Sequence, residues 1–362
     1  MTGTSDRSPS TVFVGGYADP DQPGIHALRF DDQAGSLELI GSYAGIRNPS
    51  FLVVHPNRRW LYAVSETAYG QDSSAGSVWA CHLTDDERVI EPINHQPSGG
   101  DYPCHLAIDA TGRWLFVANY GTGSFSVLPI ADDGALGDPA DLIQHTGTGV
   151  NPDRQDGPHA HSVTLTPDNR WALVADLGID QIVVYAFDAE TGTLTQHGSV
   201  ATKPGAGPRH LAFHPNGRQV YAANELDNTV VLYEYDATNG TLHEQQRLPT
   251  LPPDAPENTV ADIHIAPSGD RLYVSNRGHN SLAVFAIGSD GRLTSVAIPS
   301  CGGNWPRNFA IGSDGRFVLV ANQRSDDLVV LPVVDGSDAL GDAAARVSIS
   351  QPSCVQIVSG HE

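Results

Sequence analysis

The sequence predicts an all-β protein, a seven-bladed β-propeller whose ring is closed by pairing of its N- and C-terminal strands. Three observations lead to this prediction. Three short phrases recur in the same order along the chain, they return with a period of about 50 residues, and one repeat is divided between the two ends of the chain. A period of about 40 to 50 residues made of short strands is typical of propellers.

Each repeat supplies a tight turn, an apolar strand and a strand rich in β-branched residues, in this order. The turns begin at His55, Asp109, Thr166, His214, Ala266 and Gly312. The apolar strands that follow end at Glu66, Tyr120, Leu177, Glu225, Arg277 and Gln323. The β-branched strands span residues 76–83, 123–130, 180–187, 228–235, 280–287 and 326–333. Short runs of this composition between Gly-rich turns predict strands.

The divided repeat predicts how the ring closes. Residues 352–357 resemble the opening strand at 103–108, and then the repeat stops. Its missing strands are predicted at the other end of the chain, at residues 11–17 and 23–30. Pairing the last strand with the first would remove the exposed sheet edges of an open array. We therefore expect one domain over residues 11–362, preceded by a disordered Ser/Thr-rich tail at residues 1–10.

The charge balance excludes several classes of partner. The 362 residues carry a formal net charge of -22, and Lys203 is the single lysine. Broad phosphate-backbone binding needs clustered basic residues, so nucleic acid is not expected as a partner. No apolar stretch is long enough to span a membrane, and the N-terminus lacks the profile of a signal peptide. We expect a cytoplasmic protein with no membrane partner.

The cysteines indicate neither a disulfide framework nor a zinc site. Cys81, Cys104, Cys301 and Cys354 are widely separated, and no CxxC pair occurs. We expect them to be buried free thiols. No metal and no cofactor are predicted.

The strand junctions are the candidate functional positions, because repeats share a scaffold and differ where they carry function. The apolar strands should end, and the next repeat's opening strands should begin, at one funnel-shaped mouth. The residues at the ends of the apolar strands are Tyr17, Glu66, Tyr120, Leu177, Glu225, Arg277 and Gln323. The opening strands begin at Ser50-Phe51, Cys104-His105, His161-Ser162, Arg209-His210, Ala261-Asp262 and Arg307-Asn308. The predicted mouth is therefore rich in Arg, His and Glu.

Four junction residues are the candidate catalytic groups: His161, Arg209, Glu225 and Arg277. Other repeats accept Leu, Tyr, Ala or Cys at these positions, so the scaffold does not require them. An ion-pair network that holds blades together is the alternative. The candidate substrate-binding residues are His159, His210, Arg307, Glu66 and His105. In contrast, Asn119, Asp176, Asn224, Asn276 and Asn322 recur before the junction residue and are expected to cap backbone groups, and His55 and His214 are expected in hairpins.

Several stretches in the central third resemble the family of seven-bladed propeller lactonases. They include Gly157–Ser162, Pro204–His210, Asn224–Leu226, Ser275–Ser281 and Trp305–Phe309. This family contains bacterial 6-phosphogluconolactonases of the propeller type and fungal 3-carboxy-cis,cis-muconate cyclases. The resemblance implies an active site made of His161, Arg209, Glu225 and Arg277, the same four residues that the comparison of repeats selects.

The arginines predict an anionic substrate. The resemblance implies a carboxylic ester hydrolase that acts on an anionic sugar lactone, with 6-phosphogluconolactone as the expected substrate. Glu225 or His161 would activate water, and Arg209 or Arg277 would stabilise the oxyanion, without a metal. Three alternatives remain open. The same groups could run a muconate-lactonising cyclase or isomerase, the propeller could be a non-catalytic binding module, or Glu66, Asp176, Glu225 or a histidine could bind a catalytic metal.

Overall fold

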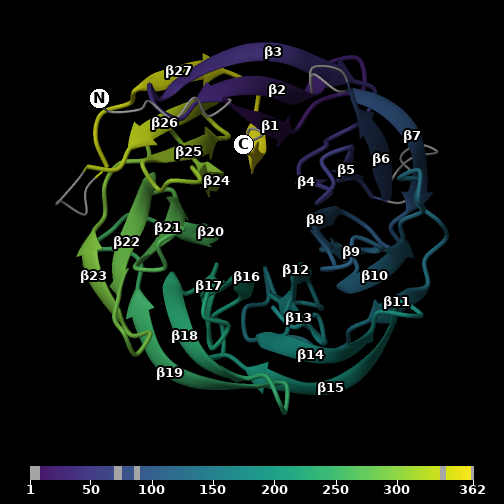
Figure 1. Ribbon diagram of the computed structural model, residues 1–362. Helices are drawn as coiled ribbons and strands as arrows, with labels where there is room; N and C mark the ends of the chain where they lie inside the picture. The colour runs from purple at the N-terminus through teal and green to yellow at the C-terminus, as the bar shows by residue number, and fades with distance from the viewer. Residues whose placement is uncertain (1–8, 69–75, 85–89, 335–339, 360–362) are drawn as a thin grey trace, which may run out of the picture.

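The computed structural model describes residues 9–68, 76–84, 90–334 and 340–359, and its strands form a closed ring around a central channel (Figure 1). In the described residues there are seven four-stranded antiparallel sheets, which are the blades. The predicted seven-bladed propeller is confirmed. These residues contain no helix that could span a membrane.

Each blade runs from an inner strand at the channel to an outer strand at the rim (Figure 1). The inner strands are β28 (Pro352–Val358), β4 (Leu52–Val54), β8 (Pro103–Ile108), β12 (Ala160–Leu165), β16 (Pro208–Phe213), β20 (Thr259–Ile265) and β24 (Pro306–Ile311). The second strands are β1 (Ser10–Gly16), β5 (Trp60–Ser65), β9 (Trp114–Asn119), β13 (Trp171–Asp176), β17 (Gln219–Asn224), β21 (Arg271–Arg277) and β25 (Phe317–Asn322). The third strands are β2 (Pro23–Asp31), β6 (Ser77–Leu83), β10 (Ser124–Pro129), β14 (Gln181–Asp188), β18 (Thr229–Asp236), β22 (Ser281–Ile287) and β26 (Asp327–Pro332). The outer strands are β3 (Ser36–Ala44), β7 (Ile90–Pro97), β11 (Asp141–Gln144), β15 (Thr193–Ala201), β19 (Thr241–Pro249), β23 (Leu293–Ala297) and β27 (Ala345–Ser348).

The ring closes across the two ends of the chain, as the divided repeat predicts. The C-terminal strand β28 is the inner strand of a blade whose other strands are β1, β2 and β3. Val14 of β1 pairs with Val355 of β28, and Val12 pairs with Ile357. Most of the expected tail at residues 1–10 lies outside the described residues. Ser10 already belongs to β1, one residue earlier than the predicted strand.

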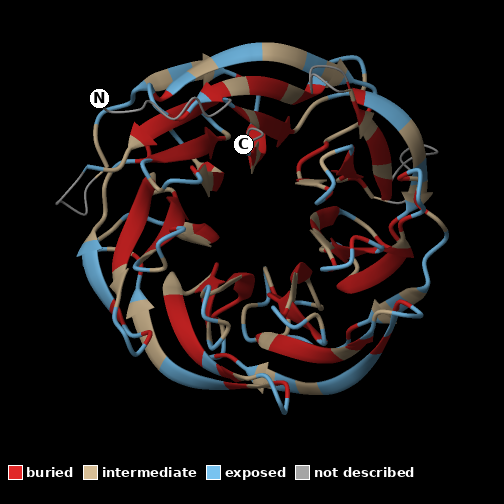
Figure 2. Cartoon of the chain, in the orientation of Figure 1, coloured by how far each residue is buried: buried red, intermediate tan, exposed pale blue. Residues whose placement is uncertain are grey.

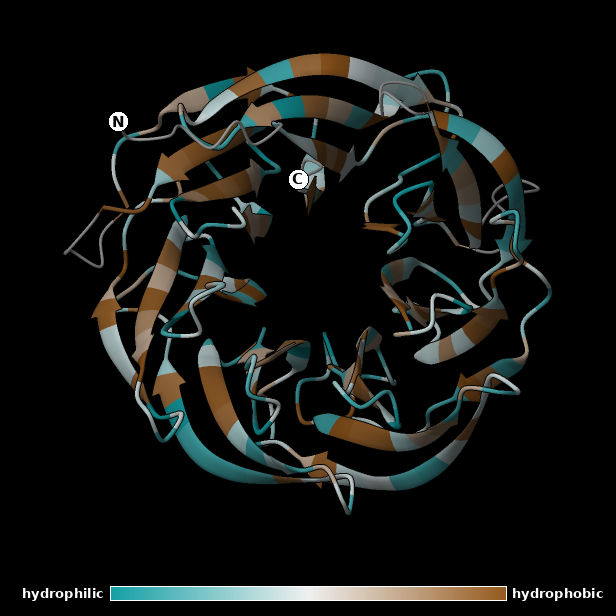
Figure 3. Ribbon diagram, viewed as in Figure 1, coloured by the Kyte–Doolittle hydropathy of each residue, from teal (hydrophilic) through white to brown (hydrophobic). Residues whose placement is uncertain are grey.

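The core lies between the blades, because each blade packs its two apolar faces against its neighbours. Buried side chains of the described residues form seven clusters, one for each pair of adjacent blades. The second and third strands are buried, whereas the outer strands alternate between exposed and half-buried residues (Figures 2 and 3). This alternation is typical of a strand with one face in water. The four cysteines are free and buried.

Glycine turns of the repeats pack against side chains of the preceding blade. Gly192 has a φ of 75° and lies directly against the Trp114 ring of the preceding blade. A Cβ added at Gly192 would lie 2.3 Å from that ring. The Trp114 indole nitrogen also donates to the carbonyl of Ala189 at 2.9 Å, in the same turn. His55 lies in the hairpin turn between β4 and β5, as expected, and its ring nitrogen lies 2.8 Å from the carbonyl of Gly112 in the next blade.

Candidate active site

A repeated backbone irregularity brings the predicted residues to one mouth of the channel. In every described inner strand except the short β4, the pairing with the second strand skips one or two residues near the start of the strand. The skipped residues form a β-bulge. The skipped residues are Cys104, His161, Arg209, Ala261 with Asp262, Arg307 and Ser353. Bulges redirect side chains and are common beside active sites. The strand openings that the sequence selects are therefore the bulged positions.

The second set of site residues follows the ends of the second strands. The amide of Glu66 donates to the carbonyl of Asn48, and the amide of Glu225 donates to the carbonyl of Gly207. Both carbonyls lie just ahead of the blade's inner strand, so these bonds hold the junction residue at the mouth. Asn119, which precedes the junction residue Tyr120, is fully buried and donates to the carbonyl of Ser98, as expected for a residue with a structural role.

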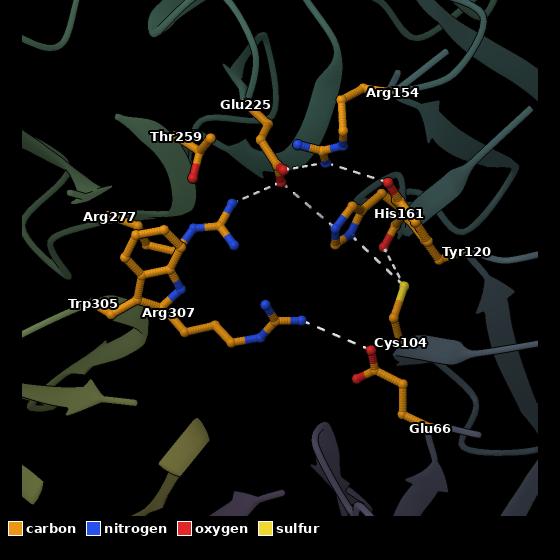
Figure 4. Close-up of a pocket in the computed structure, with 10 residues that line it drawn as sticks. All are labelled: Glu66, Cys104, Tyr120, Arg154, His161, Glu225, Thr259, Arg277, Trp305 and Arg307. Atoms are coloured by element: carbon orange, nitrogen blue, oxygen red, sulfur yellow. Dashed lines mark hydrogen bonds and ion pairs between the residues drawn. The ribbon is translucent and has the colours of Figure 1, made fainter. Parts of the chain in front are cut away.

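These two sets of residues enclose a cavity of about 330 Å³ at the mouth (Figure 4). Its lining residues come from six blades and one connecting loop. They are Glu66, Cys104, Tyr120, Arg154, His161, Glu225, Thr259, Arg277, Trp305 and Arg307. Five of them, His161, Glu225, Arg277, Arg307 and Glu66, are site residues that the sequence predicts.

Glu225 is the centre of a buried ion-pair group. Its carboxylate lies 2.8 Å from a guanidinium nitrogen of Arg277, 3.0 Å from Arg209 and 2.6 Å from Arg154. Burial alone would raise the pKa of Glu225, but Arg277, Arg209 and Arg154 outweigh it and lower the pKa to about 2. Glu225 is therefore a permanent anion at neutral pH and a weak proton acceptor.

His161 is the second candidate base, and it lies between Glu225 and Cys104. One ring nitrogen lies 3.8 Å from the Glu225 carboxylate and the other lies 3.8 Å from the Cys104 sulfur. Burial, assisted by the positive charges of Arg209 and Arg307 and by His210, lowers the pKa of His161 well below its usual value. The imidazole is consequently neutral at pH 7, and the adjacent carboxylate can stabilise the imidazolium that forms when it takes a proton.

Glu66 organises the opposite side of the cavity. Its Oε2 accepts hydrogen bonds from the hydroxyl of Tyr17, at 2.8 Å, and from the hydroxyl of Ser50. Its Oε1 faces Arg307 at 3.9 Å, and the Arg307 guanidinium stacks over the Tyr17 ring at 5.3 Å. The mouth therefore holds two carboxylates, each accompanied by at least one guanidinium.

Arg209 does not line the cavity, although it contacts Glu225. It lies beneath that carboxylate, where its guanidinium donates to the carbonyl of Ala261 at 2.6 Å. The structure thus separates Arg209 from Arg277, which reaches the cavity itself. Arg209 is thus placed to hold the Glu225 carboxylate, and Arg277 is the one of the two arginines that reaches the cavity.

His105 and His210 face a second cavity, of about 360 Å³, farther along the channel. Each follows a bulged residue, so it lies one step deeper along its inner strand. His210 bonds to the carboxylate of Asp262 at 2.7 Å, and the same carboxylate contacts His264 at 2.8 Å. The two predicted substrate-binding histidines therefore line the second cavity and not the first, although the His210 ring packs edge-on against His161 with a centroid distance of 5.5 Å.

His159 stands behind the cavity wall. Its ring stacks on Tyr120 with a centroid distance of 4.4 Å, and its Nδ1 lies 2.8 Å from the Tyr120 carbonyl. Tyr120, and not His159, lines the cavity. His159 therefore supports Tyr120 at the cavity wall.

Comparing the repeats of the sequence did not identify Arg154. Its guanidinium donates to Glu225 and to the Tyr120 hydroxyl. Arg154 belongs to the connection between β11 and β12, outside the repeated phrases. It is one of few cations in this chain and precedes the Gly157–Ser162 stretch, which is the signal that could have identified it.

The candidate metal ligands named above do not converge. Asp176 bonds to His145 at 2.6 Å and accepts the amide of His159, away from Glu66 and Glu225. Within the described ranges, no group of three or more His, Cys, Asp or Glu side chains has the arrangement of a metal site.

Comparisons with known proteins agree with this architecture. A family model described as a lactonase with a seven-bladed β-propeller matches residues 11–357. The 6-phosphogluconolactonase of Bacillus subtilis is 34% identical over 348 residues, covering 96% of this chain and 97% of the relative. The 6-phosphogluconolactonase of Formosa agariphila is 34% identical over 326 residues, covering 88% and 91% of the two chains.

A solved structure gives the same result. The periplasmic gluconolactonase of Pseudomonas aeruginosa superposes with a TM-score of 0.91 at 33% identity, covering 98% of this chain and 100% of that one. The family match confirms both the resemblance seen in the sequence and the expected class of enzyme, a carboxylic ester hydrolase. The chain belongs to the family of seven-bladed β-propeller lactonases.

Proposed function

We propose that this protein hydrolyses 6-phosphogluconolactone in the cavity at the mouth of the channel, by acid-base chemistry and without a metal. The observation that carries this proposal is the neutral imidazole of His161 beside a permanently ionised Glu225, in a cavity where guanidiniums outnumber carboxylates. The names of the two curated relatives support the choice of substrate.

The first step is attack of water on the lactone carbonyl. His161 accepts a proton from water as the oxygen bonds to the carbonyl carbon. Negative charge develops on the carbonyl oxygen, and the Arg277 guanidinium in the cavity lining donates to it. The Glu225 carboxylate, 3.8 Å from the His161 ring, stabilises the imidazolium in the same step.

The second step opens the ring. The tetrahedral intermediate collapses, the bond from the carbonyl carbon to the ring oxygen breaks, and the His161 imidazolium returns its proton to that oxygen. The product is an open-chain hydroxy acid, and His161 is again neutral. Each step uses only water and side chains of the cavity, so the scheme requires no cofactor.

The test is hydrolysis of 6-phosphogluconolactone by the purified protein, corrected for spontaneous ring opening. His161→Gln should lower kcat by about 10²-fold or more, as expected for loss of a general base. The control His243→Gln, at an exposed position on β19, should leave kcat unchanged. Activity that disappears in EDTA and returns with a divalent cation would replace this mechanism with metal-activated water.

A muconate-lactonising cyclase would use the same groups in another order. The curated 6-phosphogluconolactonases favour hydrolysis, since both match nearly the whole chain. A non-catalytic binding module is disfavoured for the same reason.

A further inference from the structure

Arg307 differs from the three guanidiniums that contact Glu225, because its own hydrogen-bond donors are unused within the described residues. Arg277 donates to the carbonyl of Val260, Arg209 donates to Ala261, and Arg154 donates to Glu225. In the described part of the chain, no protein atom accepts a hydrogen bond from the Arg307 guanidinium. Its nearest carboxylate oxygen, on Glu66, lies 3.9 Å away, which is beyond hydrogen-bond distance.

The fold holds Arg307 in place without using those donors. Arg307 occupies the bulged position of β24, directly after Pro306. Its guanidinium lies over the Tyr17 ring at 5.3 Å, and its side chain is 18% exposed. A guanidinium stacked on an aromatic ring keeps its N–H groups free in the plane, where they can form paired bonds to an oxyanion.

Charge at the mouth also favours a second anionic group on the bound molecule. Glu225 and Glu66 are the two carboxylates of the cavity. Opposite them stand four guanidiniums, on Arg154, Arg209, Arg277 and Arg307. Three of these already share Glu225. The fourth, Arg307, faces Glu66 at 3.9 Å, so the group as a whole carries two positive charges more than its carboxylates balance, in a protein whose net charge is strongly negative.

The positions of these groups fix the direction in which a substrate lies. In Figure 4, the Glu225 ion-pair group and His161 lie along one side of the cavity, and Arg307 extends along the other side toward Glu66. The reacting carbonyl must lie beside His161 and Arg277. An anionic substituent at the far end of the same molecule would then meet Arg307.

We propose that Arg307 binds the anionic substituent remote from the lactone carbonyl and determines specificity for phosphorylated over unphosphorylated sugar lactones. This inference rests on the proposed function. Arg307 contacts substrate in this scheme but takes no part in proton transfer. Its removal should consequently affect one substrate and spare another.

The experiment compares 6-phosphogluconolactone with glucono-δ-lactone, which has the same ring and no phosphate. For Arg307→Gln, kcat/KM on the phosphorylated lactone should fall about 10²-fold, mainly through KM, because charge-assisted bonds to phosphate are lost. On glucono-δ-lactone the change should stay within about threefold. Arg324→Gln is the matched control, because Arg324 lies over Trp305 at the same mouth but is exposed and outside the cavity lining.

The outcomes separate the two proposals. If the parent protein hydrolyses neither lactone, the proposed function fails. If the parent is active but Arg307→Gln loses activity on both lactones equally, or on neither, the specificity role of Arg307 is wrong. Thermal melting with inorganic phosphate provides an independent measurement. Phosphate should raise the Tm of the parent and of Arg324→Gln, and should raise that of Arg307→Gln by less.

Discussion

Replacement of Glu225 by Gln tests the energetics of the ion-pair group directly. Gln has the shape of the protonated acid, so Glu225→Gln imitates the neutral form of this side chain. The folded pKa of about 2 lies below the ordinary value of 4.5, and the difference corresponds to about 3 kcal/mol at 1.36 kcal/mol per pKa unit. Glu225→Gln should therefore lower the free energy of unfolding by about 3 kcal/mol at pH 7.

The expected change in Tm follows from the size of the domain. An unfolding entropy of roughly 2.1 cal/mol/K per residue gives about 0.76 kcal/mol/K for 362 residues. A loss of about 3 kcal/mol then lowers the Tm by about 4 °C, measured by differential scanning calorimetry. Glu190→Gln, at an exposed position in the turn between β14 and β15, should leave the Tm within about 1 °C, although it removes the same formal charge.

The direction in which the stabilisation by Glu225 changes with pH follows from its lowered pKa. A carboxyl group whose folded pKa is depressed stabilises the fold above its unfolded pKa, and that stabilisation is lost as the pH falls through the folded pKa. The Tm difference between the parent and Glu225→Gln should be largest above about pH 4.5 and should shrink toward pH 2. Equal Tm values at pH 7, or a difference that does not vary with pH, would refute the reasoning.

Two further predictions concern Asp262 and Gly192. Burial alone would lower the pKa of His264, but Asp262 raises it above the usual value, so Asp262→Asn should bring the His264 pKa below 6.5 in an NMR titration. An unchanged His264 titration would show that the carboxylate is not the cause. Gly192→Ala should lower the free energy of unfolding by about 1 to 3 kcal/mol, because a positive φ and the Trp114 ring both oppose a Cβ there. Gly198→Ala, which has no atom near its added Cβ, should not reproduce that loss in a denaturant melt.

The repeats made most of the fold predictable from the sequence. Each phrase maps to a strand or turn, and the strand at Pro352–Val358 completes the first blade as expected. The site was predictable to the extent that it lies within the repeat. His161, Glu225, Arg277, Arg307 and Glu66 occupy equivalent junctions and therefore reach one cavity.

Two features were not predictable from the repeat. Two residues that are adjacent in sequence at a junction can lie at different depths along the channel. Arg209 contacts Glu225 beside the first cavity, whereas His210 lines the farther cavity. The repeated sequence segments do not reveal how deep in the channel a side chain lies, because this depends on how far each strand extends into the channel. Arg154 was missed because it lies in the connection between β11 and β12, whose sequence is not part of the repeated phrases.

The bulges at the inner strands have a consequence for how such an enzyme changes during evolution. A bulged residue has no partner in the ladder, so exchange of its side chain breaks no cross-strand pair. The same backbone offset presents sulfur at Cys104, imidazole at His161 and guanidinium at Arg307. A change of one codon at such a position can thus alter the side chain presented at the mouth while the sheets that build the ring keep their pairing.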